Sequence, residues 1–105
     1  MNTENRYKFL NAIYEELKNA ERKHPVFCDT MTRVDLDGII SSLESYRMLN
    51  SSAPYSANSI LEEEIHEAME AYLKGEREHC LQELAQCGAV ILRMMEFVKN
   101  EKEAK

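Results

Sequence analysis

Residues that interrupt helices are scarce in this sequence. It has 3 glycines and 2 prolines among 105 residues, and no tryptophan. Residues with β-branched side chains do not gather into strand-like runs, so the composition favours an all-α fold. The 3 cysteines cannot all pair with one another and show no CxxC spacing. Neither a disulfide framework nor a cysteine zinc site is therefore supported, and we expect reduced thiols.

Long apolar runs and an excess of basic residues are also missing. No apolar run approaches the ~20 residues that cross a bilayer, so we expect no membrane partner. The first six residues lack the features of a signal peptide, which together with reduced thiols predicts a cytoplasmic protein. The chain has 13 Lys and Arg against 19 Asp and Glu, a net charge of −6. This balance argues against nucleic acid as a partner, although a metal ion would reconcile an acidic site with a nucleotide.

Apolar residues recur at helical spacing in four segments. We expect helices from about 4 to 23, from 32 or 35 to 49, from 56 or 58 to 73 or 74, and from 76 or 77 to about 99. The dipeptide His24-Pro25 should end the first helix, and Gly75 should end the third. The expectation is a single domain over 1–105, a four-helix bundle-like fold with a polar tail from about residue 100. Because so short a chain buries a limited core, we also expect self-association.

Several glutamates stand where a helical projection places apolar side chains. In the third segment Glu64 falls inside the apolar arc and Glu67 falls at its edge. In the fourth segment Glu83 is central to the apolar face, and Gln86 lies at its edge. The projection sends the other polar residues of the third segment toward solvent: Glu62, Glu63, His66 and Glu70. His79 is likewise expected at the surface.

Buried carboxylates need a proton, a cationic partner or a metal ion, because an unpaired buried charge is costly. If the third and fourth helices pack together, three carboxylates and one amide converge: Glu64, Glu67, Glu83 and Gln86. Such hard oxygen ligands suit Mg²⁺ or Mn²⁺, and Mg²⁺ commonly bridges to substrate phosphates. A network of salt bridges without a metal would give the same pattern.

The same residues form a recognisable pair of motifs. Residues 63–67 read EExxE, and residues 83–86 resemble ExxD with Gln86 at the last position. On consecutive helices this pair resembles the MazG-like all-α nucleoside triphosphate pyrophosphohydrolases. The resemblance implies metal-dependent cleavage of a nucleoside triphosphate to the monophosphate and pyrophosphate, by dimers or tetramers. It also implies that Glu64, Glu67 and Glu83 bind the metal with Gln86, and that Glu63 assists the attacking water.

Gln86 departs from the family pattern, since a neutral amide compensates less metal charge and cannot act as a base. The sequence therefore leaves two alternatives open. One is a catalytically impaired MazG-like protein that binds nucleotide or regulates, and the other is a helical oligomer whose glutamates only pair with Arg or Lys. Lys23 and Arg93 are weaker candidates for phosphate contacts. Lys23 better suits a helix C-terminus, and Arg93 equally suits a structural ion pair.

Overall fold

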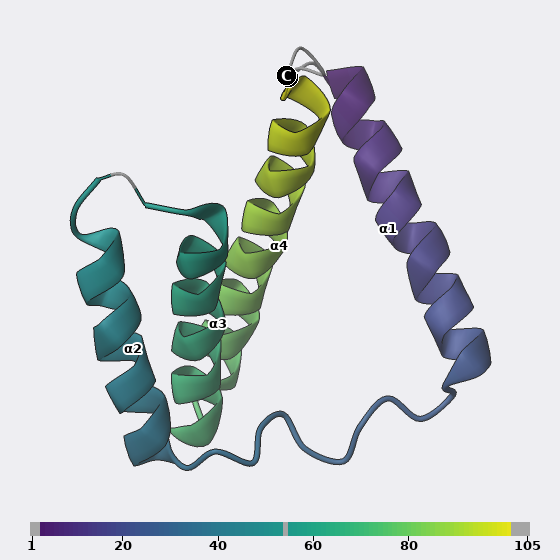
Figure 1. Ribbon diagram of the computed structural model, residues 1–105. Helices are drawn as coiled ribbons and strands as arrows, with labels where there is room; N and C mark the ends of the chain where they lie inside the picture. Colours follow the sequence, from purple (N-terminus) through teal and green to yellow (C-terminus); the bar gives the residue numbers. More distant parts are fainter. Residues whose placement is uncertain (1–2, 54, 102–105) are drawn as a thin grey trace. The chain divides into compact units, whose positions relative to one another are not determined.

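The chain folds into α-helices. A computed structural model describes residues 3–53 and 55–101, and these form α1 (Thr3–Lys23), α2 (Leu36–Asn50), α3 (Ala57–Leu73) and α4 (Arg77–Asn100), without a strand (Figure 1). The all-α class and the four helical segments expected from apolar spacing are thus confirmed. Pro54, and the expected polar tail from 102 onward, lie outside the described residues. Within the described part, no helix is both long and apolar enough to cross a membrane.

Two compact units make up the chain. One combines the residues up to Asp29 with those from Leu92 onward, and the other is Thr30–Ile91. The second unit contains α2, α3 and the first part of α4. Every glutamate singled out by the motif pair lies in this second unit.

Helix ends follow from local side-chain chemistry. Asp35 is the N-cap of α2, where its Oδ1 accepts a hydrogen bond of 2.9 Å from the amide of Gly38. Ser56 is the N-cap of α3, and its Oγ accepts from the amide of Ser59 at 3.4 Å. Such oxygens satisfy amides that have no carbonyl partner in the first helical turn. The helix α1 ends at Lys23, directly before His24-Pro25, as expected.

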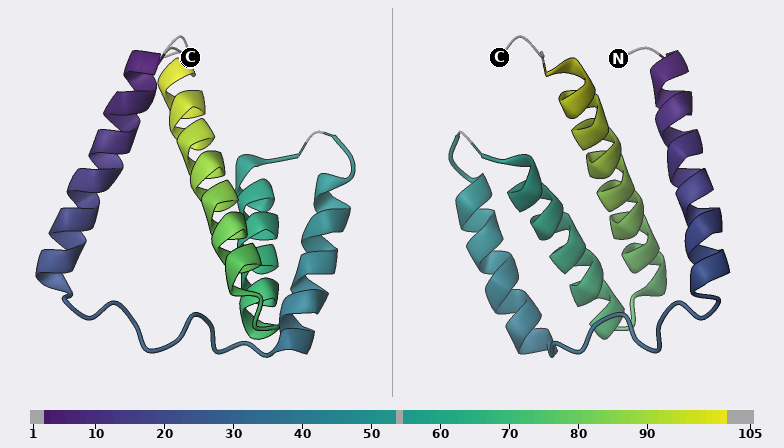
Figure 2. Two further views of the ribbon diagram at one scale, coloured as in Figure 1. Left: turned by 180° about the vertical axis from the view of Figure 1, so that it is seen from behind. Right: turned by 45° about the vertical axis from the view of Figure 1, so that its right-hand side comes forward.

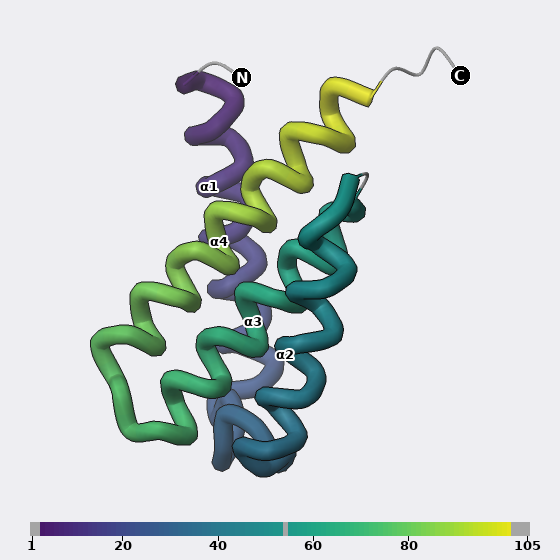
Figure 3. The backbone as a smooth tube through the Cα atoms, turned by 90° about the vertical axis from the view of Figure 1, so that its left-hand side faces the viewer, coloured from purple at the N-terminus to yellow at the C-terminus, as the bar shows by residue number. Residues whose placement is uncertain are grey.

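The turn between α3 and α4 depends on Gly75. This residue has a φ of 78°, in the left-handed region that glycine adopts most readily. Its amide donates to the carbonyl of Tyr72 at 3.0 Å, and the amide of Glu76 donates to that of Ala71 at 2.9 Å. This pair of bonds is a Schellman motif, which closes α3 and starts α4 after a very short connection (Figure 3).

Helix α3 lies between α2 and the first part of α4 (Figures 1 and 2). On α2 the side chains of Ile39 and Leu43 are each 1% exposed. Small side chains, Ala68 and Ala71 of α3, cluster with Cys80 of α4. Because α3 is covered on two sides, none of its residues from Ser59 to Tyr72 is fully exposed.

Because α3 is covered on two sides, some side chains that the helical projection placed in solvent are partly buried. The side chains of Glu63, Glu70 and His66, expected in solvent, are only 25%, 23% and 15% exposed. The Nδ1 atom of His66 lies 2.7 Å from the carbonyl oxygen of Glu62, and its ring lies 5.2 Å from that of Tyr46. The expectation was wrong because the projection assumed one buried face, whereas α3 also faces α2.

The first unit exposes apolar side chains. Helix α1 has no buried residue, and Arg6 of α1 forms an ion pair of 3.2 Å with Glu96 of α4. Large apolar side chains of α1 that are at least 42% exposed are Tyr7, Leu10, Ile13, Tyr14 and Leu17. Exposed apolar surface of this kind accords with the expected self-association, which stays a prediction.

Two glycine substitutions should change stability in opposite directions. Gly75→Ala should lower the free energy of unfolding by roughly 1–2 kcal/mol, because alanine resists the left-handed conformation. Gly88→Ala should raise it by roughly 0.5–1 kcal/mol, because alanine favours a helix interior. An added Cβ meets no atom within 4 Å at either position, so neither effect includes a steric clash. Urea unfolding of both variants tests this, and a stabilising Gly75→Ala would contradict the turn described above.

Candidate metal centre

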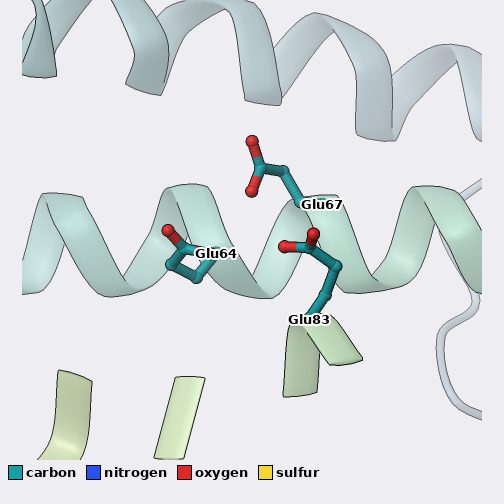
Figure 4. A group of neighbouring side chains, drawn as sticks. All are labelled: Glu64, Glu67 and Glu83. Carbon is teal, nitrogen blue, oxygen red and sulfur yellow. The ribbon is translucent and has the colours of Figure 1, made fainter. Parts of the chain in front are cut away.

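Three glutamates converge between α3 and α4. Glu64 and Glu67 project from α3, and Glu83 reaches them from α4 (Figure 4). One carboxylate oxygen of each lies within 4.8 Å of those of the other two. The spacing of i and i+3 puts the first two on one side of α3, and the turn at Gly75 brings α4 back along it. We call Glu64, Glu67 and Glu83 the carboxylate triad.

Two oxygens of the triad are buried without a partner. Glu83 is only 9% exposed, and its Oε1 accepts no hydrogen bond. The Oε1 atom of Glu64 is also buried and without a hydrogen bond. A buried carboxylate in this condition requires a proton or a cation, because it has lost the hydration that stabilised its charge.

Burial raises the pKa of Glu64 to about 7, and the negative charges of Glu67 and Glu83 contribute to the increase. Near neutral pH the triad therefore shares a proton readily when no cation is near it. Burial, together with the charge of Glu64, also raises the pKa of Cys87. Cys87 is consequently a thiol packed beside the triad, as expected for a core cysteine, rather than a thiolate ligand.

Helix α2 supplies a cation to the edge of the triad. The Nη2 atom of Arg47 donates a hydrogen bond of 3.0 Å to Oε2 of Glu67, and its Nε lies 3.9 Å from Oε2 of Glu63. The hydrogen bond with Glu67 raises the pKa of Arg47. Glu63 also accepts a hydrogen bond of 2.7 Å from Nδ2 of Asn50. Glu63 therefore faces α2, next to the triad and outside it.

His79 contacts the triad from α4. Its Nε2 lies 3.2 Å from Oε2 of Glu83, and its Nδ1 lies 3.2 Å from Oε1 of Glu76. The hydrogen bonds with Glu76 and Glu83 raise the pKa of His79. The side chain is 53% exposed, so the predicted surface position is confirmed, but its contact with Glu83 was not foreseen.

Sequence reasoning also missed Arg47 and Asn50. Both stand in the last turn of α2 at a spacing of three residues, which places them on one side of the helix. That spacing was a visible signal. Nothing in the sequence indicated, however, which helix this side would face.

The remaining predicted residues are exposed, and two of them belong to the other unit. Gln86 is exposed on α4, and its role as a fourth ligand stays a prediction. Lys23 and Arg93 are exposed as well and belong to the unit that does not contain the triad. Their assignment as phosphate contacts also stays a prediction.

The triad fits a hard divalent cation in its chemistry. All three residues offer carboxylate oxygens, the donors that Mg²⁺ and Mn²⁺ prefer. The two buried oxygens without partners are the atoms that a cation would satisfy. Paired side chains alone would leave both of them without compensation.

Replacing Glu64 should flatten the pH dependence of stability in metal-free protein. The pKa of Glu64 is about 7 in the folded state, against an ordinary value of 4.5. The folded protein thus binds the proton more tightly, and this residue's contribution to stability is lost as the pH rises through that range. At about pH 8, Glu64→Gln should therefore melt at a higher temperature than wild type. The difference should be roughly 4–8 °C for each 1 kcal/mol by which the substitution raises the free energy of unfolding. Thermal unfolding with EDTA measures this.

Glu62→Gln is the matched control, since Glu62 is on the same helix and its side chain is 42% exposed. Its difference from wild type should stay constant over the same pH range. A stability profile of Glu64→Gln that runs parallel to wild type would contradict the raised pKa.

Comparisons with protein-family models, curated proteins and solved structures found no match for this chain. The likeness to the MazG-like enzymes therefore rests on the motif residues alone.

Proposed function

We propose that this protein is a metal-dependent nucleoside triphosphate pyrophosphohydrolase. It converts an NTP or dNTP to the monophosphate and pyrophosphate, with Mg²⁺ as its cofactor and Mn²⁺ as a substitute. The observation that carries the proposal is the carboxylate triad with its two buried oxygens that accept no hydrogen bond. The EExxE motif and its partner motif on the next helix supply the reaction class by resemblance.

A purely structural cluster accounts less well for the triad. Arg47 neutralises Glu67, and His79 contacts Glu83 through Oε2. Neither contact reaches the buried oxygen of Glu64 or the other oxygen of Glu83. A divalent cation held by all three residues would satisfy both oxygens at once.

Each residue of the site has a role in the proposed reaction. Glu64, Glu67 and Glu83 would hold the metal ion, which when bound compensates phosphate charge and polarises water. Glu63, oriented by Asn50, accepts a proton from the water that attacks phosphorus in the α–β anhydride. A bond then forms from the water oxygen to phosphorus, the bond to the bridging oxygen breaks, and pyrophosphate leaves.

The proposed enzyme also has expected partners and an expected location. A chain of net charge −6 needs the metal to accommodate a triphosphate, and Lys23 and Arg93 are the weaker candidates for added phosphate contacts. Self-association into dimers or tetramers would cover exposed apolar surface such as Leu81 on α4, which is 62% exposed. The proposed site of action is the cytoplasm, where nucleotides are present.

A second candidate function is favoured by Gln86. This residue is an exposed neutral amide at the position where the family motif has Asp. A protein with this change would bind nucleotide in a regulatory role without turnover. Gln86→Asp separates the two functions, because the added carboxylate restores turnover only to an impaired enzyme.

Pyrophosphate release tests the proposed function directly. Wild-type protein is offered a panel of nucleoside and deoxynucleoside triphosphates with Mg²⁺, with Mn²⁺ and with EDTA. We expect pyrophosphate and the monophosphate in equal amounts, only with metal, and with a preference among the bases. Folded protein that releases no pyrophosphate from any of them would contradict the enzyme assignment. Turnover gained by Gln86→Asp would then support the second candidate.

Glu67→Gln should abolish the metal-dependent reaction. Loss of a charged ligand should lower kcat/KM by about 100-fold or more, in the range seen when a single stabilising group is removed from an active site. Saturating Mg²⁺ should raise the melting temperature of wild type and not that of the variant, because only a ligand of the folded state stabilises it. Glu62→Gln is the control on the same helix and should retain both activity and the Mg²⁺ shift. Unchanged turnover in Glu67→Gln would overturn the assignment.

A further inference from the structure

The carboxylates of α3 face two different neighbours. In Figure 4 the carboxylate of Glu67 extends from α3 toward α2, and Glu83 approaches from α4. Glu67 is therefore shared between the triad and Arg47 on α2. On the α2 side, Glu63 and Glu67 form a second pair of carboxylates one helical turn apart. This second pair is where a further cation would be expected in a cluster so rich in negative charge.

Side chains of α2 contact three of the four oxygens of that second pair. Oε1 of Glu63 accepts from Asn50 at 2.7 Å, and Oε2 of Glu63 lies 3.9 Å from Nε of Arg47. Oε2 of Glu67 accepts from Nη2 of Arg47 at 3.0 Å. The buried oxygens without a partner belong instead to Glu64 and Glu83. The buried oxygens that a cation would satisfy thus belong to the contact between α3 and α4.

We propose that the guanidinium of Arg47 takes the place of a second divalent cation between Glu63 and Glu67, so that each chain binds one divalent cation, at the carboxylate triad. This inference rests on the proposed function, since it specifies how many metal ions the same site holds. A guanidinium suits the place because it keeps its charge and presents several donors in one plane.

Asn50 keeps this arrangement in position. Its Oδ1 accepts a hydrogen bond of 2.7 Å from Oγ of Ser59, and its Nδ2 also donates to the carbonyl of Ser59 at 3.0 Å. The end of α2 is therefore tied to the start of α3. Glu63 is held toward α2 as a result, in the orientation in which it meets Arg47.

Counting Mn²⁺ ions tests the inference without reference to activity. Metal-stripped wild type is titrated with Mn²⁺ alone, by calorimetry and by electron paramagnetic resonance. We expect one Mn²⁺ for each chain, with the spectrum of an isolated ion. Arg47→Gln should bind two, with a spin-coupled spectrum, because Glu67 would then bridge neighbouring ions as in two-metal sites.

Matched variants distinguish the effect of the Arg47 guanidinium from the effect of losing any one positive charge. Arg77→Gln removes the same charge from the same unit, where Arg77 lies 5.3 Å from the ring centroid of Tyr72, and it should still bind one ion. The double variant Arg47→Gln with Glu63→Gln should return to one ion, because the second pair has lost a carboxylate. Glu63→Gln alone should also bind one, with an affinity that falls less than about tenfold, the lower limit for disturbing a residue that supports a metal ligand.

The outcomes distinguish the inference from the function on which it rests. Two Mn²⁺ ions in wild type, or one in folded Arg47→Gln, would overturn the inference and leave the proposed function intact. Wild type that binds no Mn²⁺ would overturn both. If circular dichroism shows that Arg47→Gln does not fold, the count in wild type decides the question, since one ion supports the inference and two ions overturn it.

Discussion

The packing of α4 against α3 brings like charges together, and the rest of the site depends on this constraint. Glu83 is nine-tenths buried, and it lies against two further carboxylates, Glu64 and Glu67. Mutual repulsion and lost hydration both oppose this arrangement. The small side chains of Ala68 and Ala71, packed with Cys80, hold the two helices together near the turn. The apolar contact therefore brings together carboxylates whose negative charge neighbouring side chains neutralise only in part.

The carboxylates on the two sides of α3 have different partners. Toward α2, Arg47 and Asn50 engage the carboxylates of Glu63 and Glu67 with fixed donors. Toward α4, Glu64 and Glu83 keep oxygens that have no partner. Arg47 thus supplies a cation on the α2 side of α3, whereas the buried oxygens that accept no hydrogen bond belong to Glu64 and Glu83.

The geometry shows where the residues of the two motifs lie. The residues of EExxE divide between the two sides, since Glu63 faces α2 while Glu64 and Glu67 belong to the triad. The partner motif contributes Glu83 from a helix that the Schellman turn at Gly75 returns along α3. Consecutive helices with a very short connection are therefore sufficient to assemble the triad from neighbouring parts of the chain. We propose for this arrangement a metal-dependent reaction on a triphosphate.

The sequence by itself determined the all-α class, the approximate ends of the helices and the glutamates that lie on apolar faces. Local signals sufficed for these, because caps such as Asp35 and Ser56 act within one turn and helical spacing places Glu64, Glu67 and Glu83 on apolar faces. Only the tertiary structure showed that the second face of α3 packs against α2. Helical periodicity shows which residues share a face of one helix, but not which neighbour covers it. For that reason Arg47, Asn50 and His79 went unforeseen, and Glu63 and His66 were wrongly expected in solvent.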